Sequence, residues 1–211
     1  MRKWYPLIVF MATVVISVVA YPRLPARVPT HWDLEGHING DSSRWAAALM
    51  MPVMIVAMWG WFGFLPTIDP RRANYEKFTK AYDRIRDAVI TMLAAVHALI
   101  IGSALGYPVN AERVAPVAVG LLLVVIGNVL PQARPTWFVG VRTPWTLSND
   151  RVWERTHRVA GHLTVAAGVL TVALAFGPPR IAGPGIGVLG ITAAVGSVIY
   201  SYVAWKQETS R

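Results

Sequence analysis

Residues 127–161 read GNVLPQARPTWFVGVRTPWTLSNDRVWERTHRVAG, and the rest of the chain is interpreted around this stretch. It leaves one apolar run, crosses a polar connection and enters a second apolar run. Tryptophan rings sit at the headgroup depth of a bilayer, and arginine side chains reach from there toward water or phosphate. The connection is rich in both residue types, which is typical of a segment at a membrane interface. These residues are Trp137, Trp145, Trp153, Arg134, Arg142, Arg151, Arg155 and Arg158.

The composition of the whole chain indicates a membrane protein. Of the 211 residues, 55% are hydrophobic and only 15% are charged, against the usual quarter. Six apolar runs approach the ~20 residues that a helix needs to cross the hydrocarbon core. We therefore predict an all-α polytopic membrane protein, a bundle of six transmembrane helices with short amphipathic cytoplasmic helices. The net charge of +9 fits juxtamembrane basic residues facing anionic headgroups, so we predict no direct binding of nucleic acid.

Alternating apolar and polar stretches divide the chain into four parts. Residues 1–66 are expected to form a two-span unit around an extracytoplasmic loop at 22–44. Residues 67–87 are expected to form a cytoplasmic amphipathic connection, helical from Asn74 and lying along the interface. Residues 88–205 then form a four-span region with a cytoplasmic connection at 131–158, and residues 206–211 form a polar tail. The first apolar run exceeds the usual length of a signal peptide, which favours an uncleaved signal-anchor.

The distribution of lysine and arginine predicts the orientation. Fifteen of these residues fall on the side that holds both termini, and five fall on the opposite side. The positive-inside rule therefore predicts that both termini are cytoplasmic. The 22–44 loop is then outside the cell and the 131–158 connection is inside.

Basic residues recur on one face of a helix predicted to begin after the N-cap residue Ser148 or Asn149. If this helix continues into the fifth apolar run, the face holds Arg151, Arg155, Arg158 and His162. An anchor at anionic headgroups is the favoured interpretation of this stripe, and a docking surface for an acidic partner is the alternative. Glu154 and His157 are three residues apart, but the full ligand set of a metal motif is missing. We predict no metal site and no cofactor.

The remaining polar residues give weaker predictions. The outer loop superficially resembles a calcium loop, but its glycine is misplaced and Arg44 stands where a bidentate glutamate belongs, so a hydrogen-bonded turn is predicted. The possible calcium ligands are Asp33, Glu35, Asn39 and Asp41. His97, in the middle of the third run, fits a functional ionisable group and a hydrogen-bonded neutral histidine equally well. Asn128 is predicted to bond backbone groups exposed around Pro131. With no catalytic motif, the chain is not expected to be an enzyme.

Two further predictions concern local structure. Pro144 biases Thr143 toward an extended conformation, so residues 142–145 are predicted to be non-helical and to present Arg142 and Trp145 to the interface or the bundle. Arg142 is predicted to contact exposed carbonyls at the end of the fourth run or a lipid phosphate. Small residues recur along the sixth run, and this face is expected to pack within the bundle. They are Gly183, Gly187, Gly190, Ala194 and Ser197.

The order of residues around the connection resembles the signature of the SdpI family of bacterial integral membrane proteins. The resemblance lies in Gly127-Asn128, Pro131, residues 137–147 (WFVGVRTPWTL) and residues 152–161. Residues 25–40 independently resemble the extracytoplasmic motif of a small uncharacterised domain often found ahead of that region. The resemblance implies functional candidates at Asn128, Pro131, Gly140, Arg142, Thr143, Pro144, Trp145, Trp153, His157, Arg158 and Gly161, and in the outer loop at Pro29, His31, Trp32 and Gly36.

The SdpI family is typified by an immunity protein against a secreted toxic peptide, which in the type case also sequesters a repressor at the membrane. The resemblance therefore implies a protein of the bacterial cytoplasmic membrane that gives immunity to such a peptide, signals its presence, or both. Its implied partners are membrane lipids, the peptide outside and a transcriptional repressor inside. The alternatives are a small-solute transporter or channel, with His97 and Asn128 facing an internal path, and a membrane enzyme of unknown chemistry. The lack of acidic residues in the spans counts against transport.

Overall fold

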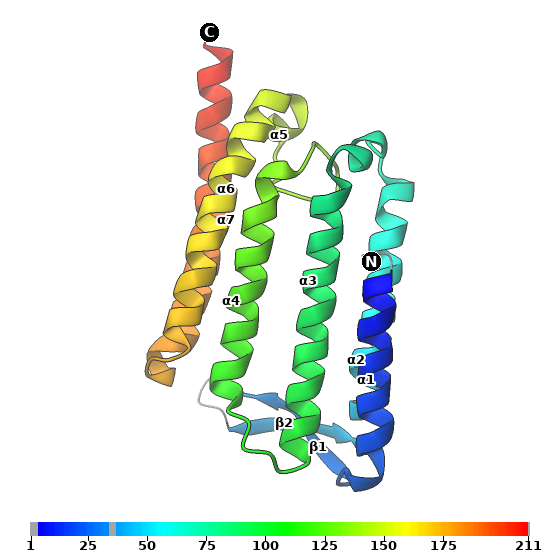
Figure 1. Ribbon diagram of the computed structural model, residues 1–211. Helices are drawn as coiled ribbons and strands as arrows, with labels where there is room; N and C mark the ends of the chain where they lie inside the picture. Colours follow the sequence, from blue (N-terminus) through cyan, green and yellow to red (C-terminus); the bar gives the residue numbers. More distant parts are fainter. Residues whose placement is uncertain (1–3, 34–36, 211) are drawn as a thin grey trace.

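The computed structural model describes residues 4–33 and 37–210 as a bundle of long helices with a small sheet at one end (Figure 1). Six of its helices are long and apolar enough to cross a membrane, which confirms the predicted six-span bundle. In chain order the elements are α1 (Tyr5–Ala20), the 3-10 turn η2 (Tyr21–Arg23), β1 (Arg27–Trp32), β2 (Ile38–Ser43), α2 (Arg44–Ile68), α3 (Ala73–Ala104), α4 (Ala111–Val129), the 3-10 turn η3 (Leu130–Gln132), α5 (Pro144–Ser148), α6 (Asp150–Leu174) and α7 (Pro179–Thr209).

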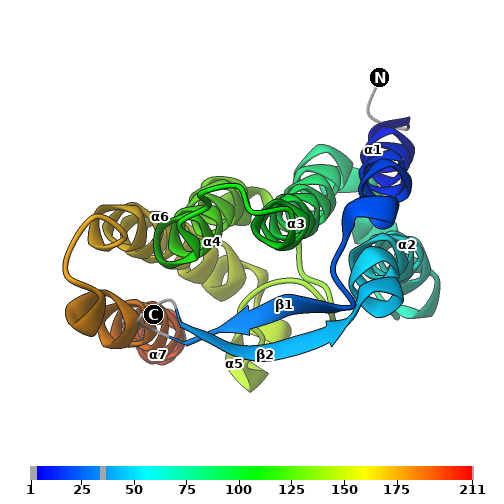
Figure 2. The ribbon, with the colours of Figure 1, turned by 90° about the horizontal axis from the view of Figure 1, so that it is seen from below.

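The helices form two rows. Seen along the bundle, α1, α3, α4 and α6 follow one another in one row, while α2 and α7 lie apart on the other side (Figure 2). The sheet lies across one end of the bundle, between α2 and α7, and we call this the hairpin end. The opposite end carries α5 and the C-terminal part of α7, and we call it the α5 end (Figure 1).

The outer loop contains a β-hairpin that the sequence did not predict. Strands β1 and β2 are antiparallel, pairing Arg27 with Ser43 and Trp32 with Ile38. Pro29 lies within β1, since a proline is tolerated in a sheet with only two strands, whereas Pro22 lies in the 3-10 turn η2. The Asn39-Gly40 pair, a sequence typical of turns, lies inside β2, where Gly40 opposes His31 beside a register shift.

The amphipathic helix predicted from Asn74 is present, and a kink at Phe78 joins it to the third span within α3. Helix α3 begins at Ala73 and continues through the third span for 32 residues, with non-helical backbone angles only at Phe78 (φ −135°, ψ 25°). Its aromatic face has a protein partner instead of lipid. Tyr75, Phe78 and Tyr82 pack in a buried cluster with Phe62 of α2 and with residues at the end of α4. This cluster is the core of the α5 end.

The closest helix contact in the bundle joins α4 and α6 through glycines. A Cβ atom built on Gly127 would lie 2.7 Å from the carbonyl oxygen of Gly161, and one built on Gly120 would lie 2.7 Å from that of Gly168. Small residues allow this backbone-to-backbone approach. The face of α7 predicted to pack closely does not do so at Gly187 and Gly190, since a Cβ atom at either position would meet nothing within 4 Å.

Candidate functional site

Residues 131–158, which we call the signature segment, fold over the junction of α4 and α6. Trp153 on the first turn of α6 is fully buried, and its indole N–H donates to the carbonyl of Ala133 at 2.9 Å. The same ring stacks on His157, with centroids 3.9 Å apart and planes inclined by 20°. Trp153 therefore ties the start of the segment to α6.

His157 is a structural hydrogen-bonding residue inside the segment. Its Nδ1–H donates to the carbonyl of Trp153 at 2.8 Å, which leaves Nε2 to accept the backbone N–H of Val141 at 2.9 Å. Gly140 lies directly over the ring with φ +114°, and a Cβ atom there would be 2.1 Å from Nε2. Only glycine combines this backbone angle with this close approach. The roles of Gly140 and His157 in the segment are therefore linked.

Helix α5 corrects our prediction for residues 142–145. Thr143 is extended (φ −116°, ψ 161°), as expected of a residue before proline, but Pro144 and Trp145 are helical. Proline suits the first position of a helix because the N–H it lacks would be unpaired there. Thr143 caps the helix by accepting from the N–H of Thr146 at 3.2 Å. This turn lets the indole N–H of Trp145 reach the hydroxyl of Ser201 on α7 at 2.6 Å.

Arg142 is exposed and makes a contact within its own segment. Its Nη1 donates to the carbonyl of Trp137 at 2.7 Å. The predicted carbonyl partner is thus present, but it belongs to the coil after α4 and not to the end of that helix. The interaction closes the loop that carries Gly140.

Asp69, which the sequence analysis did not single out, joins the two halves of the chain. It is 3% exposed, and its Oδ1 accepts from the N–H of Arg71 at 2.8 Å. Oδ2 accepts from the Tyr75 hydroxyl at 2.9 Å and from the N–H of Trp137 at 3.0 Å. An isolated aspartate before a proline at the end of a span was the only signal in the sequence.

Two more contacts clamp the α2–α3 turn onto the signature segment. Arg71 donates to the carbonyl of Leu147 at 2.6 Å, and the side-chain amide of Asn74 donates to that of Pro135 at 2.8 Å. Together with Asp69, these two residues attach the coil and helix α5 of the signature segment to the α2–α3 turn. Backbone groups of the segment that would otherwise be unpaired thereby gain partners.

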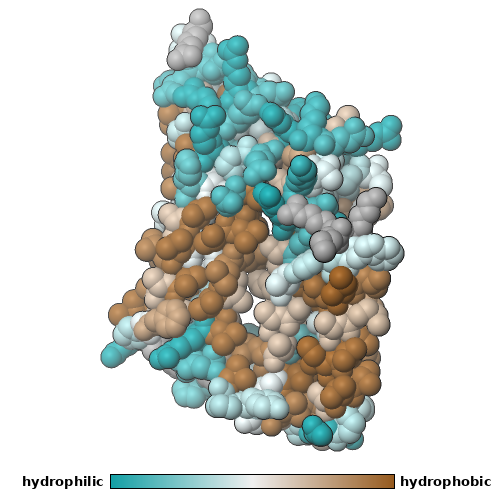
Figure 3. All heavy atoms as spheres, viewed as in Figure 1, coloured by the Kyte–Doolittle hydropathy of each residue, from teal (hydrophilic) through white to brown (hydrophobic). Residues whose placement is uncertain are grey.

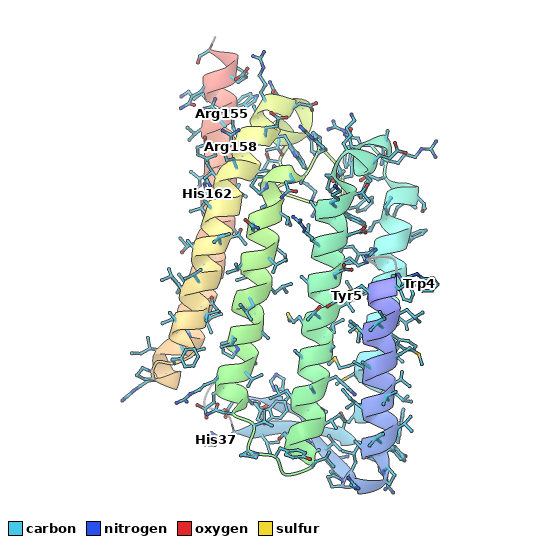
Figure 4. The ribbon with its side chains drawn as sticks, viewed as in Figure 1. Trp4, Tyr5, His37, Arg155, Arg158 and His162 are labelled. Carbon is cyan, nitrogen blue, oxygen red and sulfur yellow. The ribbon has the colours of Figure 1, made fainter. Side chains whose placement is uncertain are left out.

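The basic stripe is present on α6, because that helix begins after its cap Asn149 and runs unbroken to Leu174. Two arginines of the stripe contact α7: Arg151 pairs with Glu208 at 3.0 Å, and Arg155 donates to the side-chain oxygen of Gln207 at 2.6 Å. Glu154 pairs with Arg134 at 2.6 Å and not with Arg158. Arg158 and His162 remain exposed along α6 (Figure 4). The described residues contain no group of side chains that could hold a metal ion.

Asn128 near the end of α4 and Pro131 in η3 are two further signature positions, and they differ in role. Pro131 packs on Gly161, whose Cβ atom would lie 2.9 Å from the proline ring. Asn128 is exposed and makes no hydrogen bond with another described residue, so the predicted bond to backbone around Pro131 is wrong. The reason is that Leu130–Gln132 continue as a 3-10 turn, which satisfies the N–H of Ala133 from Leu130.

A second candidate site lies under the hairpin. Thr30, His31 and Trp32 of β1 face a cavity of about 350 Å³ whose other walls come mainly from the ends of α3, α4 and α7 nearest the hairpin. Trp32 also packs against the buried cluster at the hairpin end. His31 Nδ1 is hydrogen-bonded to the side-chain oxygen of Asn39 at 2.5 Å. Pro29 pairs with Asp41 in the strand register, whereas Gly36 lies outside the described residues.

The hairpin end also contains polar pairs where a calcium loop was considered. Asp41 forms an ion pair with Arg27, and Asp33 accepts the N–H of His37 at 2.8 Å. These contacts agree with the predicted hydrogen-bonded turn.

His97 lies fully buried between α1 and α3. Ser17 donates to the carbonyl of Ala48 at 2.7 Å, so its oxygen is free to accept from His97 Nε2 at 2.9 Å. His97 thus joins three helices through one serine, as a hydrogen-bonded histidine does. Asn128, in contrast, is exposed and lines a cavity near the α5 end.

Comparisons with known proteins agree with both parts of this architecture. Residues 132–202 match the SdpI/YfhL protein family, and residues 8–56 match a domain of unknown function, DUF1648. The chain is 25% identical over 175 residues to the immunity protein SdpI of Bacillus subtilis (strain 168), which covers 81% of this chain and 79% of the relative. No solved structure matches the chain. The protein is therefore a multi-pass membrane protein in which a region that matches DUF1648, and contains the hairpin, precedes a region that matches the SdpI/YfhL family and contains most of the signature segment.

Proposed function

We propose that this protein gives its host immunity to a secreted toxic peptide and that the cavity under the hairpin receives the peptide. The proposal is supported by the similarity to the immunity protein SdpI over most of the chain. The observation that carries the binding site is the position of His31 and Trp32 on the wall of the 350 Å³ cavity. An aromatic ring and an imidazole at the mouth of a partly apolar cavity suit an apolar peptide with a few polar groups.

The charge distribution supports an orientation with the hairpin outside the cell. Among the residues that the structure describes, twelve lysines and arginines fall on the side of the α5 end and five on the side of the hairpin end. The α5 end then faces the cytoplasm, where a repressor could meet the exposed Arg158. Signalling to such a repressor is the second part of the proposed function. Reporter fusions after Asn110 and Ser148 check the orientation and should report outside and inside, respectively.

The function can be tested by complementation. A B. subtilis strain without its own SdpI, challenged with its toxic peptide, should survive when it expresses this protein. Trp32→Ala should raise the sensitivity of the cells to the peptide about tenfold, because buried aromatic contacts dominate peptide binding. The matched control is Ile38→Ala on β2, an exposed hairpin residue that does not line the cavity.

Three outcomes decide between the parts of this proposal. Cells expressing the unaltered protein that die like the empty strain contradict immunity to this peptide. Equal sensitivity of the Trp32 and Ile38 variants at matched membrane abundance contradicts the binding site. A reporter gene under the repressor, measured in the same cells, tests signalling separately from survival.

A further inference from the structure

A groove runs along the face of the bundle between α3 and α4. It includes a hollow of about 570 Å³ whose lining is almost entirely apolar, with Ala88, Met92, Ala95, Val117 and Leu121 along it and Arg113 at its hairpin end. The space-filling view shows the surface hollowed between the two halves of the bundle (Figure 3). At this depth the surroundings are hydrocarbon, so an apolar chain fills such a hollow better than water does.

The end of the groove nearest α5 is polar. Arg84 of α3 and Asn128 of α4 line a smaller cavity of about 360 Å³, and Val125 borders both this cavity and the apolar hollow. Both polar side chains are exposed, and neither makes a hydrogen bond or ion pair with another described residue. Arg86, two residues away, is instead paired with Asp83 and Asp87. Arg84 is thus a cation without a counter-ion among the described residues. Its guanidinium carries five N–H donors, and the side-chain amide of Asn128 adds further donors to the same cavity.

The aromatic residues of α1 give the depth of this polar end. Trp4 and Tyr5 lie together at the start of α1 (Figure 4), as aromatic residues do at headgroup depth. The Tyr5 hydroxyl is hydrogen-bonded to Thr91 of α3 at 2.6 Å. Arg84 precedes Thr91 by about two helical turns, roughly 10 Å along α3. The guanidinium therefore lies at or just beyond the headgroups, and the apolar hollow begins below them.

We infer that this groove binds an anionic phospholipid. One acyl chain occupies the apolar hollow between α3 and α4, and the phosphate accepts hydrogen bonds from the guanidinium of Arg84 and the side-chain amide of Asn128. At its α5 end the groove offers a cation and a donor to a phosphate, and the hollow that follows offers hydrocarbon contacts to an acyl chain as far as Arg113 at its hairpin end. A transmembrane helix of a second copy does not match this profile, because it would leave both polar side chains without a partner. This site is separate from the peptide cavity under the hairpin.

The inference can be tested by native mass spectrometry of the full-length protein released from nanodiscs of mixed phosphatidylglycerol and phosphatidylcholine. We expect retained phosphatidylglycerol on the unaltered protein. Arg84→Gln should weaken its binding about fivefold, the effect of one basic side chain at an anionic surface. The matched control is Arg72→Gln, an exposed arginine at the same end that does not line the groove. It should leave retention unchanged.

A second pair of variants tests the acyl chain. Ala118→Phe and Ala95→Leu add side-chain volume to the hollow and should displace the lipid while Arg84 is intact. Two substitutions are used so that a misfolded variant, recognised by its circular dichroism spectrum, does not decide the result. Equal losses for Arg84→Gln and Arg72→Gln would mean non-specific charge attraction and would overturn the inference. So would lipid retention unaffected by filling the hollow, or a dimer without retained lipid.

Discussion

The two ends of the bundle are closed in different ways. At the hairpin end, two short strands are joined mainly by backbone pairing, and side chains such as His31 remain at a cavity wall. At the α5 end, the signature segment has little regular structure and is held by side chains. His157, Trp153 and Trp145 each donate or accept a bond that fixes the course of the chain.

This difference bears on how a family signature is interpreted. At the α5 end, the polar groups of the signature residues Thr143, Trp145, Trp153 and His157 are satisfied within the protein, so these residues specify a shape more than they present a surface. The exposed residues near this end include Arg142, Arg158 and His162. Hairpin residues have the opposite character, since the sheet needs little from their side chains. Substitutions at the α5 end should therefore affect folding first, and those at the hairpin should affect ligand binding first.

The largest effect is expected for Gly140→Ala. The methyl group would enter the ring of His157, and alanine would also be strained at φ +114°. We expect a loss of about 3 kcal/mol or more in the free energy of unfolding, from the clash together with the backbone strain. Thermal unfolding in detergent measures the change.

Gly106→Ala is the control for this prediction, because Gly106 also has a positive φ (+81°) but an added Cβ would meet nothing within 4 Å. It should cost about 1 kcal/mol, from strain alone. A Gly140 variant no less stable than the Gly106 variant would show that the signature segment tolerates displacement from His157. The contrast between the two ends would then be lost.

An intermediate effect is expected for Asp69→Asn. The substitution keeps the shape but replaces one acceptor oxygen by an amide, so either the N–H of Arg71 or that of Trp137 loses its partner. A lost bond to a buried charged group costs about 2 kcal/mol. The thermal midpoint should fall, and hydrogen exchange should rise in residues 135–147 but not in the hairpin. Asp150→Asn, at an exposed aspartate, should change neither; uniform exchange throughout the chain would contradict a local clamp.

The smallest effect is expected for Arg142. A single guanidinium nitrogen of Arg142 donates a hydrogen bond to the carbonyl of Trp137, and the ammonium group of a lysine can also supply one donor. Arg142→Lys should therefore stay close to the unaltered protein in thermal stability and peptide protection. Arg142→Ala should lose about 1 kcal/mol or less. If lysine proved as harmful as alanine, the side chain would need its planar two-pronged geometry, and the exposed surface at this end would bind a ligand directly.

The sequence predicted those features that depend on local composition. The six spans followed from run length, and the cap at Asn149 followed from its place before an acidic first turn. The hairpin was missed because its strands are short and interrupted by register shifts, so alternation was too weak to detect. Asp69 was missed because its partner Trp137 lies 68 residues away, a distance at which no periodicity operates. Pro144 was misjudged because proline restricts the residue before it while itself favouring a helix start.

The bond between Trp145 and Ser201 has a consequence for biosynthesis. The two residues are 56 positions apart, and Ser201 is near the end of the chain. While the ribosome is still making α6 and α7, the indole of Trp145 lacks the Ser201 hydroxyl, so α5 is held from the α2–α3 turn but not yet from α7. The signature segment therefore reaches its final form only after the last helix has left the ribosome and entered the membrane. A chain that stops short of this point can hold six-helix topology in large part, yet it lacks the finished α5 end.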